Sequence, residues 1–152
     1  GPGPYTGLRV GIVTGRVLAE IAGAQLHGIC SLDVIAAQHV ASGEPTSEFV
    51  VVTDARRKEG YWARYAPDGN RLEGPAVDKS TAAPRLPTVG PAADLYADTL
   101  EVVAGPRSLD PGILALAGPQ LSDAGVEPLY LRRPDAAEPG RRKSVLVRRA
   151  GR

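Results

Sequence analysis

The first apolar pattern along the chain has the period of an α-helix. From residue 6 onward, apolar side chains recur at spacings near three and four, which places them on one stripe. The stripe consists of Leu8, Ile12, Val13, Val17, Leu18 and Ile21. We predict a helix over residues 6–24, with Thr6 as its N-cap and Gly23 at its end. Gly11 and Gly15 lie one turn apart, which indicates close approach by another helix or loop, because a mid-helix glycine costs about 1 kcal/mol relative to alanine.

A short apolar segment and a second helix are expected next. Residues 26–30 are apolar after His27 and predict a buried strand. Ser31 is the expected cap of a helix over residues 32–41, where apolar positions again have helical spacing. The Ser, Gly, Glu and Pro of residues 42–45 predict a linker and a boundary between two lobes.

The middle of the chain has the pattern of an antiparallel meander. Residues 49–54 are nearly all β-branched and apolar, and residues 60–66 alternate aromatic and polar side chains. A turn signal at residues 67–70 separates them from a third predicted strand at residues 71–77. Short turns between these strands favour neighbouring antiparallel pairing.

The pattern becomes shorter and more interrupted after residue 80. Residues 88–90 predict one more strand, and residues 91–103 predict a helix with Leu95, Leu100 and Val103 facing inward. Asp110 and Pro111 form an N-cap and N1 pair that opens a helix through residue 117. Residues 128–132 read as a short extended piece, and the remainder as coil.

Composition narrows the class of protein. The chain has 152 residues, which suits one ordinary domain or two small lobes. No apolar run approaches the roughly 18 residues of a membrane helix, so we expect a protein without a membrane partner. The single cysteine excludes a disulfide framework and fits a reducing cytosol. The chain opens on a glycine-rich turn without an initiator methionine, and we expect a fragment or a mature form that lacks an N-terminal segment.

The formal net charge of +1 conceals an uneven distribution. Residues 131–152 carry eight Lys or Arg and two acidic residues, whereas residues 1–130 carry ten and fifteen. A basic tail can contact phosphate backbones or an acidic partner, and it can equally be a solvated terminus. Seven of the eight are candidate phosphate contacts: Arg132, Arg133, Arg141, Arg142, Lys143, Arg148 and Arg149.

The opening sequence GPGPYTGLR is the strongest local candidate for binding chemistry. A glycine-rich turn before a helix exposes backbone N–H groups and suits an anion, so Gly1, Gly3, Thr6 and Gly7 are candidate phosphate-binding residues. The alternative is a plain strand-to-helix connection without a ligand. The turn is not a Walker loop, because no lysine follows at the required place.

Other candidates have structural interpretations. His27 and His39 are twelve residues apart without a neighbouring ligand at helical spacing, so we predict surface or hydrogen-bonded structural histidines and no metal site. Cys30 reads as a small core residue rather than a nucleophile. The charged run between Asp54 and Trp62 is either a binding edge, with Asp54 and Arg56 fixed in a loop, or a solvated hairpin turn.

Four sequence blocks together resemble one known family. The blocks GPGPYTGLRVGIVTGRVLA, GICSLDVIAA, VVTDARRKEGYWARY and EPLYLRRPDA follow the order and the intervals of the TsaB (YeaZ) family, over most of residues 1–135. This family contributes to making threonylcarbamoyladenosine in tRNA. A full-length member begins with an Asp-containing β-hairpin and a helix before the GPGPYTG turn, and neither is found here.

The resemblance implies a fold and a division of the chain. TsaB-like proteins have the two-lobe α/β architecture of the actin-like, sugar-kinase-like (ASKHA) class. The implied division is residues 1–45 as the remainder of the first lobe, residues 46–135 as the second lobe, and residues 136–152 as a basic tail. The second lobe should be a sheet with antiparallel hairpins and flanking helices. The remainder of lobe one should expose an apolar helix face that lobe two, a partner or a second copy must cover.

The resemblance also implies a role. TsaB-like proteins are cytoplasmic, non-catalytic relatives of TsaD, bind TsaD through first-lobe helices, support the ATPase TsaE, and form homodimers through the same surface. An older glycoprotease label for relatives has no support here, because we find no nucleophile–base pair. The implied partner-binding residues are Leu8, Arg9, Gly11, Ile12, Gly15, Arg16 and Ala19, with tRNA reached through the complex and ATP or ADP at a subunit interface. Two alternatives stay open: a nucleotide- or phosphate-binding ASKHA enzyme, and a tRNA-contacting module that uses the basic tail.

Overall fold

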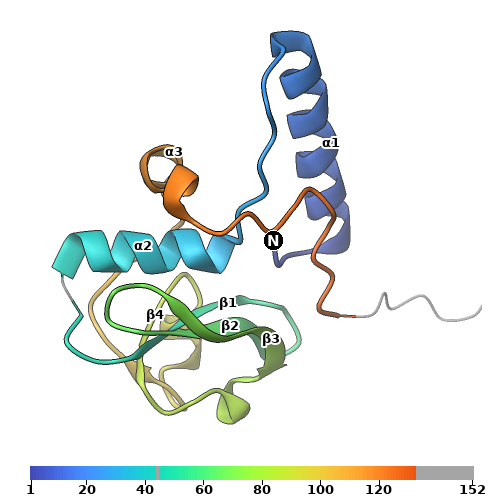
Figure 1. Ribbon diagram of the computed structural model, residues 1–152. Helices are drawn as coiled ribbons and strands as arrows, with labels where there is room; N and C mark the ends of the chain where they lie inside the picture. Colours follow the sequence, from blue (N-terminus) through green and yellow to red (C-terminus); the bar gives the residue numbers. More distant parts are fainter. Residues whose placement is uncertain (44, 133–152) are drawn as a thin grey trace, which may run out of the picture.

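A five-stranded mixed sheet forms the centre of the protein. The computed structural model describes residues 1–43 and 45–132 (Figure 1). The strands β1 (Phe49–Asp54), β2 (Glu59–Tyr65) and β3 (Arg71–Lys79) form the predicted antiparallel meander. On the other side of β1, the strands β4 (Pro87–Val89) and β5 (Glu101–Val102) run parallel to it, which gives the order β3-β2-β1-β4-β5.

Alternate residues of β1 bury on opposite faces of this sheet. Phe49 and Val51 pack with the helix α2 (Ser31–Gly43), whereas Val50 and Val52 pack with the segment that follows β3. Because both faces are covered, the first four residues of β1 are all apolar and do not alternate in polarity, and polar residues enter only at Thr53 and Asp54, where the strand ends. The helix α2, which the sequence assigned with residues 1–45, therefore shares a core with the sheet.

The helix α1 (Tyr5–Ala22) stands away from this core (Figure 1). Gly23 ends it in a left-handed conformation, as predicted. The prediction of Thr6 as the N-cap is wrong. The cap is Pro4, no side chain caps the helix, and Thr6 lies inside the first turn, because the fixed backbone angle of proline already suits the residue before a helix.

Two further predicted elements are absent from the described residues. Residues 26–30 make no strand there, only an isolated bridge between Ile29 and Asp123, because no neighbouring strand offers a ladder. Residues 91–103 form a 3₁₀ turn, η2 (Asp94–Tyr96), and then β5, because pairing with β4 claims the backbone at residues 101–102. Leu95 is exposed rather than inward, whereas Leu100 is buried as predicted.

The short helix α3 (Pro111–Ala117) follows the prediction closely. The Asp110 carboxylate accepts a hydrogen bond of 2.7 Å from the Gly112 N–H, and Pro111 occupies the first position of the helix. Two more 3₁₀ turns, η1 (Ser80–Ala82) and η3 (Gly118–Gln120), complete the described elements. The predicted basic tail, residues 136–152, lies outside the described residues.

Candidate functional site

Helix α1 has apolar side chains on two opposite faces. Leu8, Ile12, Gly15 and Ala19 follow one another at spacings of four, three and four, and these are half-buried. Val10, Val13, Val17 and Ile21 lie on the opposite side, at spacings of three, four and four. We call these the inner face and the outer stripe. The single stripe that the sequence predicted is therefore two surfaces.

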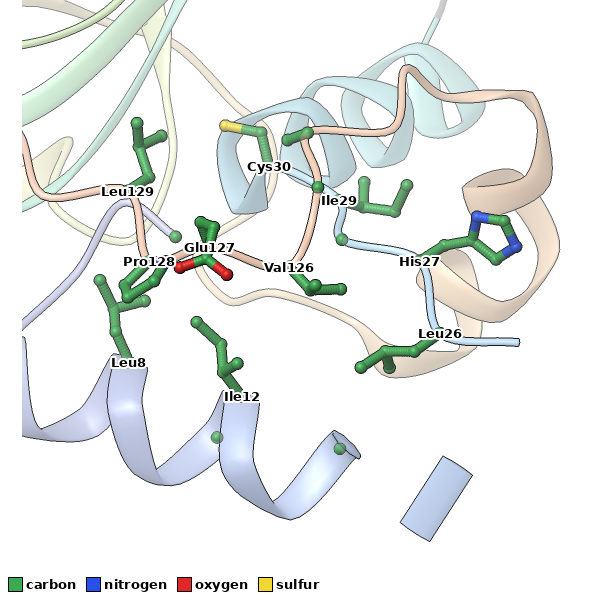
Figure 2. Close-up of a pocket in the computed structure, with 16 residues that line it drawn as sticks. Leu8, Ile12, Leu26, His27, Ile29, Cys30, Val126, Glu127, Pro128 and Leu129 are labelled. Carbon is green, nitrogen blue, oxygen red and sulfur yellow. The ribbon is translucent and has the colours of Figure 1, made fainter. Parts of the chain in front are cut away.

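The inner face is turned toward the chain's own C-terminal strap, residues 124–130. A cavity of about 410 Å³ lies between them, and Leu8 and Ile12 point into it toward Val126 and Pro128 (Figure 2). A side-chain carbon built on Gly15 would lie 3.5 Å from Leu26, which is an ordinary van der Waals distance, and one built on Gly11 would meet nothing within 4 Å. The close approach that these two glycines predicted is therefore not found among the described residues.

Polar contacts hold the strap on α1. A terminal nitrogen of Arg16 lies 2.8 Å from the Glu127 carboxylate and donates to the Val126 carbonyl. Arg9 donates a hydrogen bond of 2.9 Å to the Tyr130 hydroxyl, and its guanidinium lies over the Tyr5 ring. The structure thus places most of the predicted partner-binding set against the chain itself.

The outer stripe has no comparable cover. Within residues 1–43 and 45–132, no residue of α1 is buried, and the stripe side chains range from 52% exposed for Val17 to 79% for Ile21. Leu18, beside the stripe, is also exposed. An exposed row of β-branched side chains along a helix typically marks an interaction surface. The sequence pattern contained this signal, because Val10 lies three residues before Val13.

The four predicted phosphate-binding residues do not share one cavity. Gly1 lines the cavity beside the inner face, and its carbonyl accepts a hydrogen bond from the Ser31 N–H. Gly3 lines a second cavity of about 310 Å³ next to the β1–β2 hairpin. Thr6 and Gly7 are exposed and line neither of these. The assignment of these residues to an anion stays a prediction.

The two histidines occupy different environments. The His27 ring lies 3.0 Å from the Asp123 carboxylate at the surface. His39 is buried against Phe49, and its Nδ1 has no hydrogen-bond partner among the described residues, contrary to the expected hydrogen-bonded histidine. Burial lowers the pKa of His39. Across the part of the chain that the structure describes, no three His, Cys, Asp or Glu side chains are grouped so that they could hold a metal ion.

Cys30 has the environment of a core thiol. Its side chain is buried, and burial, together with the nearby Asp33 carboxylate, raises the pKa of the thiol. A raised pKa is the opposite of what a nucleophilic thiolate needs. None of the helices among the described residues has the length and apolarity required to cross a membrane.

The charged run after β1 forms a tight hairpin loop. Arg56, Arg57 and Lys58 all have left-handed backbone conformations, with φ of 65°, 56° and 62°. The Asp54 carboxylate accepts a hydrogen bond of 2.7 Å from the Arg56 N–H, and the Glu59 N–H donates to the Arg56 carbonyl. The structure confirms a hairpin turn in which the Asp54 carboxylate binds backbone, whereas the interpretation as a binding edge stays a prediction.

Comparison with known proteins places this architecture in a class. Two solved structures from Pseudomonas aeruginosa are similar to this chain. YeaZ matches with a TM-score of 0.66 and 21% identity, over 86% of this chain and 71% of YeaZ. An uncharacterized protein described as similar to peptidase YeaZ matches with a TM-score of 0.63 and 22% identity, over 87% of this chain and 70% of that protein. These likenesses show the fold. The chain has the mixed α/β, ASKHA-like fold of the YeaZ proteins, as predicted.

The family follows from the sequence comparison. The family model TsaD, described as tRNA N6-adenosine threonylcarbamoyltransferase, matches residues 1–110. The chain belongs to this tRNA-modification family, and together with the YeaZ fold this confirms the predicted TsaB (YeaZ) membership. Uncharacterized proteins of Mycobacterium tuberculosis and Mycobacterium bovis are 40% identical over 139 residues, and one of Mycobacterium leprae is 41% identical over 152. The chain covers 63% of the length of the first two relatives and 37% of the third, and 90% of this chain is matched in each.

Proposed function

We propose that this chain is a non-catalytic subunit of the assembly that makes threonylcarbamoyladenosine in tRNA, and that it binds a catalytic TsaD-type subunit through helix α1. The observation that carries the proposal is the outer stripe of Val10, Val13, Val17 and Ile21. The family membership supports the tRNA pathway. The buried thiol of Cys30, with its raised pKa, supports a role other than nucleophilic catalysis.

The energetics of α1 favour a helical partner. The 18 residues of α1 include three glycines and several β-branched side chains, which lower its intrinsic helix propensity, and most helices gain their stability by burying an apolar face. Full burial of a Val or Ile side chain contributes about 1.5–3 kcal/mol, so four such side chains supply a substantial driving force for docking. Their spacing of three and four residues matches the ridge that packs into the groove of a second helix.

The contacts of the inner face give it a different part in this proposal. Leu8 and Ile12 line the cavity beside the strap, while Arg9 and Arg16 bind strap residues. In this proposal the outer stripe contacts the partner. The inner face packs against the strap and so fixes the orientation of α1 relative to the core. Gly11 lies at the edge of the cavity, between the two surfaces.

The proposal is tested by placing charge on the outer stripe. V13E/V17E should raise the Kd of the complex with purified TsaD at least tenfold, because it removes the burial of two valines and places two charges in the interface. A loss of 1.4 kcal/mol in binding free energy already corresponds to a factor of ten in Kd. The matched control is L95E/L116E, which introduces the same charges at two exposed leucines away from α1. Titration calorimetry on both variants gives the Kd values. Equal affinity of the two variants for TsaD would show that the outer stripe is not the contact surface.

The other parts of the role belong to the same proposal. We include support of TsaE, ATP or ADP at a subunit interface, a cytoplasmic location, and homodimer formation through the outer stripe when TsaD is absent. Light scattering should then report a dimer for the unmodified chain and a monomer for V13E/V17E. If both the unmodified chain and V13E/V17E are dimers, the homodimer does not form through the outer stripe.

A further inference from the structure

The tip of the β1–β2 hairpin carries three consecutive basic residues, a run that occurs nowhere else in the described chain. Arg56, Arg57 and Lys58 follow one another there, and all three are exposed. The one ion pair that the structure gives Arg56 is a 3.5 Å contact with Asp54, and the Arg56 side chain stays 83% exposed. An exposed pair of this length contributes little to stability, so the positive charge of Arg56 remains accessible to a ligand.

The backbone of this tip is strained. A left-handed conformation costs a non-glycine residue about 1–2 kcal/mol, and here three such residues are consecutive. The strain is held in place by the Asp54 carboxylate and by the hydrogen bond of 2.9 Å from the Ala55 N–H to the Glu59 carbonyl. Glycine would adopt the same turn without this cost. Strained residues of this kind are found where their side chains serve a function.

Arg132 braces the tip from the opposite end of the described chain. Its guanidinium donates a hydrogen bond of 2.9 Å to the Ala55 carbonyl and forms an ion pair with Glu59. The side chain is three-quarters buried, so it acts as a fixed support. Counting Arg132 and the three tip residues against Asp54 and Glu59, the hairpin end keeps a net positive charge of two.

The tip separates two hollows. One, of about 310 Å³, is lined by Tyr5, Tyr61 and Tyr130 together with the two tip arginines and Arg132. The other, of about 550 Å³, has the three tip residues on one side and Ser80, Asp98 and Thr99 elsewhere on its wall. A mononucleotide would occupy one hollow, whereas an extended chain of phosphates can pass over the tip and use both.

We infer that the hairpin tip, Arg56 to Lys58, is a contact site for the phosphate backbone of RNA, with the tyrosine-lined hollow beside it receiving an unstacked base. Arginine binds phosphate oxygens through two parallel hydrogen bonds, and tyrosine rings stack on bases that have left a helix. Tyr5 and Tyr130 are already stacked on each other, with ring centroids 4.8 Å apart, and the Arg9 guanidinium lies over the Tyr5 ring. An incoming base would therefore stack on the Tyr130 ring, which this arrangement holds in place. The inference rests on the proposed function in that the RNA would be the tRNA that the assembly modifies.

The test measures RNA binding by the full chain without TsaD. Fluorescence anisotropy with a labelled tRNA transcript should show R56N/R57N binding about tenfold more weakly than K79N/R85N, which removes two exposed positive charges elsewhere. The slope of log K against log salt should fall by about 0.7–0.9 for each lost phosphate contact. Asparagine tolerates the left-handed conformation, so the tip should keep its fold, and circular dichroism checks this.

Three outcomes overturn the inference. One is equal affinity and equal salt slope for the two variants. Another is that micromolar ATP displaces the tRNA and that R56N/R57N loses binding of both ATP and tRNA. This result would assign the site to a free nucleotide. The third is that the unmodified chain shows no tRNA binding at low salt. Since TsaD is absent, failure here leaves the proposed subunit role standing, and failure of the V13E/V17E experiment leaves this inference standing.

Discussion

The Tyr65 hydroxyl donates a hydrogen bond of 2.8 Å to Oδ1 of Asp33, which joins β2 to α2 inside the core. Arg71 lies 3.2 Å from the same carboxylate oxygen, so the buried charge of Asp33 has two partners. Burial, with the adjacent Asp33 carboxylate, raises the pKa of Tyr65 well above its ordinary value. The phenol is therefore protonated, and able to donate this hydrogen bond, at neutral pH.

Removal of this hydroxyl should cost more than removal of a comparable one. Y65F leaves the buried carboxylate of Asp33 with one partner, and we expect the free energy of unfolding to fall by about 1.5–3 kcal/mol, as for other hydrogen bonds to charged groups. The control is Y61F, whose hydroxyl makes only a 3.5 Å contact with the Gly3 carbonyl. Urea unfolding at pH 7 measures both variants. Equal losses would mean that the Tyr65 contact has no special weight.

The buried His39 should make stability depend on pH. Because its pKa is lowered in the folded protein, the unfolded chain binds a proton that the folded chain does not, in the window from the unfolded value of about 6.5 down to the folded one. Above that window His39 is neutral in both states and does not change the free energy of unfolding with pH. As the pH decreases through the window, the free energy of unfolding falls. H39L should abolish this loss, which reaches at most about 1.4 kcal/mol at one pH unit below the unfolded value. Urea unfolding at pH 5.5 and 7.5 measures the difference.

The H39L variant also tests the missing hydrogen bond. A buried polar atom without a partner costs about 1–3 kcal/mol, so leucine should not destabilise the protein at pH 7.5 despite the loss of the ring contact with Phe49. A variant with the same pH dependence as the unmodified protein would show that His39 titrates normally.

Relief of the strain at the hairpin tip should stabilise the protein. K58G replaces a residue at φ 62° with glycine, which adopts this conformation freely, and we expect a gain of about 0.5–1 kcal/mol after the entropy that glycine loses on folding. The control K79G, at the end of β3, should lose a similar amount, because glycine weakens a strand. Thermal unfolding distinguishes the two. Destabilisation by both would mean that the Lys58 side chain makes contacts that outweigh the strain.

Helix α1 should open more readily than the sheet. It has no buried residue within the described chain, so its amides should exchange with solvent far faster than those of β1 and β2, which form the core ladder. Addition of TsaD should slow exchange in α1 and leave β1 unchanged. Hydrogen exchange followed by mass spectrometry measures both segments in one sample. Equal protection of α1 and β1 without a partner would contradict this view of the helix.

Much of the fold could be read from local sequence signals. The strand β1 was predicted at its observed bounds, and β2 differs by one residue at each end, because turn residues and β-branched runs specify a hairpin within a short window. The cap of α3 by Asp110 is equally local. The family resemblance added the fold class, which no single pattern could supply.

The failures share a physical cause. Residues 91–103 have the spacing of a helix, yet their backbone at residues 101–102 pairs with a strand that lies earlier in the chain. Residues 26–30 have the composition of a strand but no neighbour to pair with among the described residues. The buried Nδ1 of His39 likewise depends on which surfaces meet, since its helix alone does not decide its burial.

The amino-acid sequence by itself determined the helices α1, α2 and α3, the β1–β2 hairpin, the family, and the basic composition of the loop after β1, because each depends on residues that are near in the chain or on a pattern of blocks. Only the tertiary structure decided that α1 has an inner face and an outer stripe, and that Tyr5, Tyr130 and Arg132 gather at the hairpin tip. The helical repeat places Val13 and Ile12 on neighbouring positions of one helix, but packing of the C-terminal strap, from more than a hundred residues away, selects which of them remains exposed.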